Sequence, residues 1–306
     1  MATLPFDDRP GVIWMNGALV PWTEARLHVL SHALHYASAV FEGERAYGGV
    51  IFKGHEHHER LCRSAGILDF AVPYTVAEID AAAEQVLAAN GLSDAYLRPI
   101  AWRGSEMMGV SAQATRINLA IAAWEWPAYF SPELKTKGIR LKLAPWRRPA
   151  PECAPTQSKA AGLYMICTLS KHAAEREGYQ DALMLDHRGF VAEATGANVF
   201  LVQDGKLHTP TPDCFLDGIT RRTVIELARA QGIEVIERKI TLEDLDRASE
   251  VFLTGTAAEV TPVGEIDGRH YTPGRISQGL VEAYQAEVRK PAAEWTRTQL
   301  PTAEAA

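Results

Sequence analysis

Short apolar segments separated by turn residues fill the first part of the chain, a pattern that predicts strands. Two dipeptides, Asn16-Gly17 and Gly48-Gly49, each lie between two of these segments. Both tolerate the positive φ angles of two-residue turns, so two hairpins are predicted. Their strands are residues 12–15, 18–22, 44–47 and 50–53. A helix is expected to follow the second hairpin through residues 59–68.

Helical spacing is clearest after residue 74. Thr75 and Glu78 form the pattern of a capping box, in which each side chain accepts a hydrogen bond from the other residue's backbone amide. The apolar positions that follow keep a period of three to four residues and end at Asn90-Gly91, a common helix stop. Two longer apolar stretches, residues 95–102 and 117–124, are predicted strands.

Residues 125–137 lose any period and contain Pro127 and Pro132 among aromatic and charged residues. We interpret them as a connection between a small amino-terminal α/β domain, residues 1–124, and a larger domain, residues 138–306. In the larger domain we predict strands at 139–144, 182–185, 199–202, 234–238 and 250–253, and helices at 163–177, 220–230 and 277–290. This mixture predicts an α+β chain.

Length and charge narrow the choice of ligand. The chain has 306 residues, more than one ordinary core accommodates, which favours two domains. Its net charge of −7 argues against a nucleic-acid partner, because neutralising phosphates needs a basic surface. We find neither an apolar stretch long enough to span a membrane nor the pattern of a signal peptide. A cytoplasmic protein with a small-molecule ligand is therefore expected.

Metal chemistry is not favoured by the cysteines and histidines. The four cysteines, Cys62, Cys153, Cys167 and Cys214, lie far apart without a CxxC pair. The cluster His55-Glu-His-His58 lacks the spacing of the HExxH motif, so a solvated turn is expected. His28 and His32 lie four residues apart among apolar neighbours, and we expect them to pack or cap beside the active site.

Lys159 has the most unusual surroundings of the nine lysines. It lies between small residues in Ser158-Lys-Ala-Ala-Gly162, where a planar cofactor has room to approach, and a predicted helix follows. A lysine that forms a Schiff base needs this space and reacts as the neutral amine. A surface lysine would fit the same local pattern, so the pattern alone does not decide between the two.

Three other segments are typical of cofactor binding. Glu193 lies at the end of a predicted strand, where a carboxylate could pair with a pyridinium nitrogen; an exposed loop acid is the alternative. Asp217-Gly-Ile-Thr220 precedes a predicted helix, and Thr254-Gly-Thr-Ala-Ala258 follows a predicted strand. Both offer amides and hydroxyl groups to a phosphate, although each fits an ordinary cap or loop equally well. Neither matches a nucleotide-binding glycine loop, which favours a smaller phosphate compound.

Eight segments in order resemble those of fold-type IV pyridoxal-phosphate enzymes, specifically the bacterial branched-chain amino acid aminotransferases. They are His28-Val-Leu-Ser-His-Ala-Leu-His-Tyr36, Val40-Phe-Glu-Gly43, His58-Glu-Arg-Leu61, Ala95-Tyr-Leu-Arg-Pro99, Lys159-Ala-Ala-Gly162, residues 193–198, Gly218-Ile-Thr-Arg221 and Gly255-Thr-Ala-Ala-Glu259. The resemblance covers nearly the whole chain. It implies a two-domain α+β fold like that of D-amino acid aminotransferase, with the cofactor between the domains.

The resemblance also implies roles for individual residues. Lys159 would be the catalytic residue and would bind pyridoxal 5'-phosphate covalently, Glu193 would face the ring nitrogen, and Tyr164 the ring hydroxyl. The other cofactor-binding residues would be Arg60, Leu216, Ile219, Thr220 and Thr256. The substrate would contact Tyr36, Phe41, Tyr96, Arg98, Met108, Val110, Trp126, Tyr129, Thr256 and Ala257. Core packing is the alternative for the aromatic residues of this set.

Arg98 is the candidate for binding the second carboxylate of 2-oxoglutarate and glutamate. Alternate residues of a strand face the same side, so Arg98 should lie beside Tyr96; a surface ion pair is the alternative. Two departures from the family leave the side-chain preference open. Glu44 follows Phe-Glu-Gly where an apolar residue is common, and Arg103 and Glu106 enrich the loop before Met108.

The expected reaction transfers the amino group of leucine, isoleucine or valine to 2-oxoglutarate. The same fold also includes D-amino acid and (R)-amine aminotransferases and aminodeoxychorismate lyase, which remain alternatives. A vitamin-B6-binding protein without catalytic activity is an alternative from another class. The resemblance further implies a homodimer or a larger homo-oligomer, in which a loop of the neighbouring subunit completes the site.

Overall fold

The computed structural model describes residues 5–126, 133 and 137–298, and the chain forms two compact units. The first unit consists of residues 1–127 together with 154–165, and the second of residues 128–153 together with 166–306. The segment around Lys159 therefore packs with the amino-terminal residues, although it lies far from them in the sequence. The domain boundaries expected from the sequence stay a prediction.

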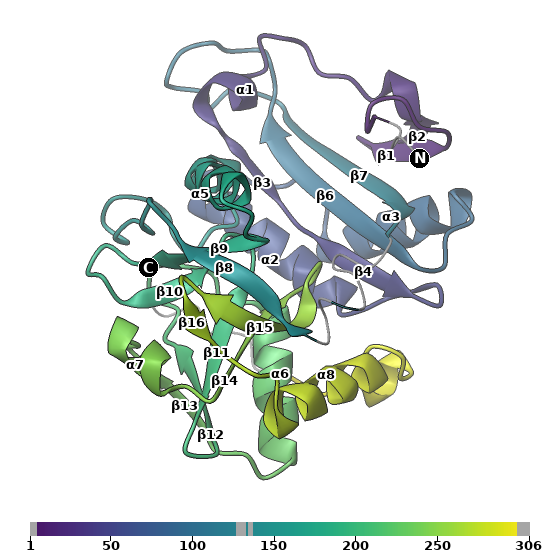
Figure 1. Ribbon diagram of the computed structural model, residues 1–306. Helices are drawn as coiled ribbons and strands as arrows, with labels where there is room; N and C mark the ends of the chain where they lie inside the picture. Colours follow the sequence, from purple (N-terminus) through teal and green to yellow (C-terminus); the bar gives the residue numbers. More distant parts are fainter. Residues whose placement is uncertain (1–4, 127–132, 134–136, 299–306) are drawn as a thin grey trace. The chain divides into compact units, whose positions relative to one another are not determined.

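In the described part of the first unit, seven strands form one antiparallel sheet in the order β2-β1-β7-β6-β4-β5, with β3 also paired to β6 (Figure 1). The strands are β1 (Val12–Met15), β2 (Ala18–Pro21), β3 (Ala39–Phe41), β4 (Glu44–Tyr47), β5 (Val50–Ile51), β6 (Ala95–Arg103) and β7 (Ile117–Glu125). The helices are η1 (Trp22–Glu24), α1 (His32–Tyr36), α2 (Gly54–Ile67), α3 (Val76–Ala89) and η2 (Ala161–Leu163).

The core of the first unit lies where α2 and α3 pack on the sheet. Leu61 of α2 and Ile79 of α3 are fully buried, as are Leu97 of β6 and Ile121 of β7. Each such side chain contributes roughly 1.5–3 kcal/mol through its removal from water. The central strands β6 and β7 pair along nine residues, from Ala95 opposite Glu125 to Arg103 opposite Ile117. This packing fixes the strand that carries Tyr96 and Arg98.

The second unit contains a mixed sheet and several helices. Its strands are β8 (Ile139–Leu143), β9 (Asp181–Leu185), β10 (Val191–Ala194), β11 (Asn198–Gln203), β12 (Lys206–Pro210), β13 (Val235–Arg238), β14 (Glu250–Gly255), β15 (Glu259–Ile266) and β16 (Arg269–His270). Its helices are α5 (Tyr164–Arg176), of which the first two residues belong to the first unit, α6 (Ile219–Ala230), α7 (Leu242–Arg247), α8 (Arg275–Glu287) and η3 (Ala292–Glu294). Helices α6 and α8 contact each other and β14 (Figure 1).

The described strands of the second unit follow the order β10-β9-β8-β15-β14-β11-β12-β13, and β16 pairs with β15. An additional pairing joins β10 to β11 through Glu193 and Asn198. This pairing closes the path of β10, β9, β8, β15, β14 and β11 on itself, so these strands have no open edge between β10 and β11. Glu193 lies at the point of closure.

Both predicted hairpins and the predicted helix of residues 76–89 are confirmed. Gly17 and Gly49 have φ angles of 99° and 86°, as two-residue turns of this kind need. The capping box is also confirmed: Glu78 N donates to Thr75 Oγ1 at 3.3 Å, and Thr75 N donates to Glu78 Oε2 at 2.7 Å. Local sequence chemistry therefore determines these elements.

Some elements were not predicted, and one prediction is wrong. Residues 55–58 were expected in a solvated turn, but they lie at the start of α2, with His57 and His58 only 2% and 1% exposed. Strand β15 was not predicted because Pro262 and Gly264 interrupt its pattern. The short elements α1, α7, β3, β12 and β16 were also missed. None of the described helices is long and apolar enough to cross a membrane.

Candidate active site

The backbone around Lys159 is held from both sides by segments of the first unit. Lys159 N donates to Ser64 Oγ at 3.0 Å, and Lys159 O accepts from Phe41 N at 3.2 Å. The next residue, Ala160, pairs with Val40 in an isolated antiparallel bridge. Because Ser64 belongs to α2 and Val40 to β3, two elements distant in sequence fix the position of this lysine.

The amine of Lys159 lies between a hydroxyl group and two aromatic rings. Its Nζ donates to the Tyr164 hydroxyl at 2.8 Å and lies 5.1 Å from the centre of the Phe41 ring. The rings of Phe41 and Tyr164 meet edge to face, with their centroids 4.7 Å apart. The residue is half-buried, so its amine is oriented by its neighbours and still reachable by a ligand. A nucleophilic lysine needs both properties.

Phe41 links Lys159 to the candidate substrate residues. The guanidinium carbon of Arg98 lies 4.7 Å from the centre of the Phe41 ring, and Arg98 Nη2 donates to the Tyr96 hydroxyl at 3.0 Å. The Trp126 ring lies 4.7 Å from that of Tyr96. The expectation that Tyr96 and Arg98 face the same side of their strand is confirmed. We call the connected set the lysine cluster; its members are Phe41, Tyr96, Arg98, Trp126, Lys159 and Tyr164.

The polar groups of the lysine cluster suit a ligand with carboxylates. Within the described residues Arg98 forms no ion pair, and its Nε is buried without a hydrogen-bond partner. Burial raises the pKa of Tyr96, so its hydroxyl keeps its proton and can donate a hydrogen bond. A half-buried guanidinium without a counter-charge is a site at which an anion is stabilised. The surface ion pair considered for Arg98 is therefore wrong.

Gly43 makes room for Tyr96. A Cβ atom at Gly43 would lie 1.9 Å from the Tyr96 hydroxyl oxygen, far closer than any real contact. The glycine of the Phe-Glu-Gly segment is thus required by a buried tyrosine on a distant strand, and any side chain at this position would displace Tyr96.

Arg60 is held by buried charges next to the lysine cluster's strands. Its Nε and Nη2 donate to the two carboxylate oxygens of Glu42 at 2.7 and 2.8 Å, and His57 Nδ1 lies 2.7 Å from Glu42 Oε2. Although burial opposes ionisation, Arg60 and His57 hold the pKa of Glu42 well below its usual range. Glu42 was part of a recognised segment but had no predicted role. No local pattern indicated that it would pair with Arg60, 18 residues away.

Glu44 faces α2 rather than a ligand. It is fully buried, and its Oε1 lies 3.1 Å from His58 Nε2, while His58 Nδ1 lies 2.6 Å from Asp80 Oδ1. Burial alone would lower the pKa of His58, but the two carboxylates raise it to about 9. We call Glu42, Arg60, His57, Glu44, His58 and Asp80 the buried ionic network. The departure at Glu44 thus changes the core, and it gives no reason to doubt the substrate preference.

Arg103 and Glu106 are also structural. Arg103 is 8% exposed and donates through Nη1 to Ala112 O at 2.9 Å. Glu106 Oε2 accepts from Arg116 N at 3.1 Å. Both side chains hold the loop between β6 and β7.

Three of the predicted substrate residues lie at the surface of the first unit instead of in the lysine cluster. Tyr36 and Met108 are 45% and 41% exposed, and Val110 is 85% exposed. No hydrogen bond or ring contact joins them to the lysine cluster within the described residues. Tyr129, also predicted to contact the substrate, lies outside the residues that the structure describes.

In the second unit, Glu193 is held by two residues that the sequence did not single out. Arg148 Nε lies 3.3 Å from Glu193 Oε1, and Asn198 Nδ2 donates to Glu193 Oε2 at 3.4 Å. The Glu193 side chain is 13% exposed and the Arg148 side chain 4%. The exposed loop acid considered for Glu193 is therefore wrong. Arg148 belongs to a segment far before Glu193, so no local pattern could have identified the pair.

Asn198 also holds the two predicted phosphate turns. Its Nδ2 donates to Leu216 O at 3.0 Å, and a Cβ atom at Gly218 would lie 2.3 Å from its Oδ1. Asn198 is paired with Thr254 in the sheet. The turn before α6 and the turn after β14 are therefore fastened to the same residue as Glu193.

The two turns fit a phosphate group. Helix α6 begins at Ile219, so its first amides point outward where Gly218 leaves space. Thr220 is 4% exposed at this helix start, while Thr256 and Ala257 lie half-buried in the turn after β14. The Oγ1 of Thr254 is buried without a partner among the described residues, so this turn has an unsatisfied hydroxyl group.

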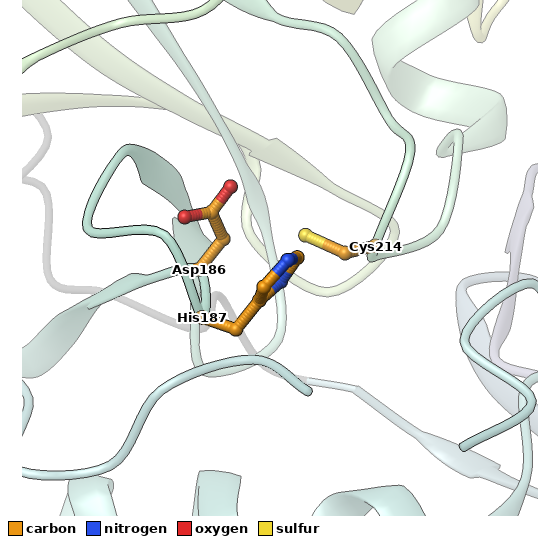
Figure 2. Close-up of side chains that lie close together, drawn as sticks. All are labelled: Asp186, His187 and Cys214. Carbon is orange, nitrogen blue, oxygen red and sulfur yellow. The ribbon is translucent and has the colours of Figure 1, made fainter. Parts of the chain in front are cut away.

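A separate trio, Asp186, His187 and Cys214, has potential metal-ligand atoms within 4.8 Å of one another, contributed by two loops (Figure 2). Both Asp186 oxygens already accept hydrogen bonds: Oδ1 from the amides of Arg188 and Phe190, and Oδ2 from the Arg188 guanidinium at 2.6 and 2.8 Å. That guanidinium would repel a cation. Burial also raises the pKa of the Cys214 thiol to about 12. These contacts identify Asp186 as a stabiliser of the turn between β9 and β10.

Comparison with known proteins was made on the whole chain. The sequence profile of the family described as amino-transferase class IV matches residues 39–266. The chain is 41% identical over 284 residues to the branched-chain-amino-acid aminotransferase of Pseudomonas aeruginosa, covering 90% of this chain and 92% of the relative.

Solved structures agree with this similarity. The branched-chain amino acid aminotransferase of the organism abbreviated T.th., solved with pyridoxamine 5'-phosphate, has a TM-score of 0.90 and 41% identity, covering 94% of this chain and 98% of that chain. The same protein complexed with N-(5'-phosphopyridoxyl)-L-glutamate has a TM-score of 0.89 and 40% identity, with the same coverage.

Proposed function

The chain belongs to the class IV amino-transferases, and we propose that it transfers the amino group of leucine, isoleucine or valine to 2-oxoglutarate, with Lys159 as the catalytic residue. The observation that carries the proposal is the lysine cluster, in which an oriented amine lies beside an apolar ring and a guanidinium without a counter-charge. Such a cluster can accept both an apolar side chain and a second carboxylate.

The cofactor is pyridoxal 5'-phosphate. When bound, it supplies an electron-withdrawing ring that stabilises negative charge at the substrate α-carbon. In our proposal Lys159 binds it covalently, and the Tyr164 hydroxyl donates to the ring oxygen. Glu193 faces the ring nitrogen, where Arg148 and Asn198 keep the carboxylate in place. Leu216 packs on the ring.

The phosphate is assigned to Arg60, to the amides of Ile219 and Thr220, and to Thr256. Helix α6 has twelve residues, so its first amides carry a partial positive charge that stabilises an anion. Glu42 holds Arg60 through Nε and Nη2, which leaves the orientation of the guanidinium fixed before a ligand arrives. The unsatisfied Thr254 hydroxyl lies next to the turn of Thr256.

Lys159 also moves the proton. Its Nζ takes the proton from the α-carbon of the donor and returns a proton to the α-carbon of the acceptor, because a positioned amine transfers a proton far faster than water does. Tyr164 and Phe41 keep the amine oriented and limit the access of water.

The substrate α-carboxylate is assigned to Tyr96 and to the amides of Thr256 and Ala257, and the second carboxylate of glutamate to Arg98. An apolar side chain contacts Phe41 and Trp126. Tyr36, Met108, Val110 and Tyr129 are proposed to complete this apolar surface.

We also propose that the chain assembles as a homodimer or larger homo-oligomer. Of the thirteen large hydrophobic side chains exposed among the described residues, seven lie in two segments of the first unit: Leu27, Val29, Leu30, Leu34, Tyr36, Met108 and Val110. A contiguous apolar surface of this kind marks an interaction site. A second copy of the chain accounts for the exposure of residues that are expected to contact substrate. The cytoplasmic location stays a prediction.

The proposal is tested by mixing the cofactor-loaded enzyme with single L- and D-amino acids and following the absorbance of the bound cofactor. L-leucine, L-isoleucine, L-valine and L-glutamate should change the absorbance, whereas D-amino acids and (R)-amines should not. A response to D-amino acids or (R)-amines alone would support those enzymes of the same fold. A response to no amine would contradict transamination altogether.

A further inference from the structure

His32 connects two segments that are proposed to contact the substrate. It is the first residue of α1, and Tyr36, the last residue of the same helix, stacks on its ring with the centroids 4.5 Å apart. His32 is 3% exposed, whereas Tyr36 is 45% exposed. The buried imidazole is therefore the platform on which an exposed tyrosine ring rests.

The same imidazole is bound to the loop between β6 and β7. The His32 amide donates to Gly104 O at 2.8 Å, where the loop begins, and its Nε2 lies 2.9 Å from Gly109 O, between Met108 and Val110. Arg103 and Glu106 hold the base of the loop, but among the described residues the bond from His32 is the only hydrogen bond that reaches residues 107–111 from outside the loop.

Ser38 determines which nitrogen of the imidazole carries the proton. A carbonyl oxygen only accepts, so Nε2 must donate to Gly109 O. Ser38 Oγ lies 2.7 Å from Nδ1, and in the neutral ring this nitrogen can only accept, so the Ser38 hydroxyl donates to it. The chain Ser38–His32–Gly109 thus has one consistent direction of hydrogen bonds.

We propose that His32 is a positioning residue for substrate selection, which holds Tyr36 and the Met108–Val110 tip in one fixed arrangement. The proposal rests on the proposed function, since it assumes that these exposed residues contact a branched-chain substrate. His32 itself touches neither substrate nor cofactor. Its effect should therefore appear in substrate binding, while the cofactor-binding residues stay in place.

Two substitutions separate the stack from the tether. His32→Phe keeps a ring against Tyr36 but removes both side-chain hydrogen bonds. His32→Gln keeps an N–H group that can donate to Gly109 O, so it should rescue the tether in part. His187→Gln is the matched control, because it replaces an exposed histidine of the second unit with the same residue.

Each cofactor-loaded variant is compared with the wild type in L-leucine turnover and in deuterium uptake by the peptide of residues 104–116. For His32→Phe we expect KM for L-leucine to rise about 10-fold or more, because two hydrogen bonds that order the loop are lost, with a smaller change in kcat. Deuterium uptake in the loop should rise as well. His32→Gln should lie between His32→Phe and the wild type, and the absorbance of the bound cofactor should be unchanged in all variants.

An unchanged KM for His32→Phe would overturn the proposal, even if deuterium uptake rises. Equal losses in both His32 variants together with a loss of bound cofactor or a lower melting temperature would also overturn it, because they indicate a general structural role. If the wild type converts no branched-chain amino acid, the proposed function fails, and unchanged deuterium uptake in His32→Phe would separately refute the tether.

Discussion

The first unit holds its two groups of candidate residues in opposite ways. Arg60 is fixed by the buried ionic network, in which Glu42 and Glu44 are fully buried and each contacts a histidine of α2. Tyr36 and Met108 lie at the surface and depend on hydrogen bonds and ring stacking made by His32. The former contacts are charged and dry, and the latter are neutral and close to water.

This difference matches the two tasks that we assign to these residues. A phosphate group has the same shape in every turnover, so a rigid, charged support for Arg60 does not limit the range of substrates. Substrates differ in side chain, and the surface that contacts them must adjust. Neutral hydrogen bonds contribute about 0.5–1.5 kcal/mol each, and this permits local opening of a loop, whereas breaking a buried ion pair costs more.

The largest expected effect breaks the buried side of the comparison. Glu42→Gln keeps the shape of the side chain but leaves the Arg60 guanidinium buried without its counter-charge. We expect the free energy of unfolding to fall by about 3–5 kcal/mol, measured by urea unfolding, and the affinity for the cofactor to fall with it. Glu226→Gln is the control, because Glu226 pairs with Arg229 at 2.7 Å on the surface of α6.

The control should cost less than about 1 kcal/mol, since exposed ion pairs contribute little. Equal and small losses in the two variants would show that burial does not distinguish the network from a surface pair.

The pH dependence of stability should sharpen the comparison. The pKa of His58 is raised from 6.5 to about 9 by Glu44 and Asp80, so the folded state holds this proton where the unfolded state releases it. The resulting stabilisation is complete below pH 6.5 and is lost as the pH rises through 9, and it amounts to about 3 kcal/mol. Urea unfolding between pH 6.5 and 10 measures this loss.

In His58→Gln the additional loss over this pH range should disappear, while His187→Gln should retain it because that histidine is exposed. A wild-type slope that persists in His58→Gln would assign the effect to other groups.

A smaller effect is expected at Arg98, where the lysine cluster meets the substrate. Arg98→Met keeps the bulk against Phe41 but removes the charge. The loss of a charge-assisted hydrogen bond of roughly 1.5–3 kcal/mol should slow the half-reaction with L-glutamate about 10- to 150-fold, and that with L-leucine much less. Single-turnover rates for the two amino acids decide the matter. Equal losses would indicate a structural role, and no loss for glutamate would assign the second carboxylate to another residue.

The sequence predicts those features that neighbouring residues determine. The hairpin at Asn16-Gly17 and the capping box of Thr75 depend on local hydrogen bonds and backbone angles, and both are confirmed. The contacts of Glu42 with Arg60 and of Arg148 with Glu193 join distant segments, so no local pattern contained them. The histidines of α2 were misjudged for the same reason.

Resemblance to a family supplied the candidate residues, and the structure shows which of them meet. It brings Phe41, Arg98 and Lys159 together, as the shared roles require. It leaves Met108 and Val110 exposed, a fact that depends on the surface of the folded unit and that sequence alone does not contain.

The central claim is that Lys159 carries the cofactor, and the most direct test is to locate the covalent link. The cofactor-loaded enzyme is reduced with borohydride, digested and mapped by mass spectrometry. The account predicts a single reduced adduct on the peptide containing Lys159, and its absence, together with the absence of turnover, in Lys159→Ala. An adduct on any other lysine, or turnover in Lys159→Ala at the wild-type rate, would contradict it.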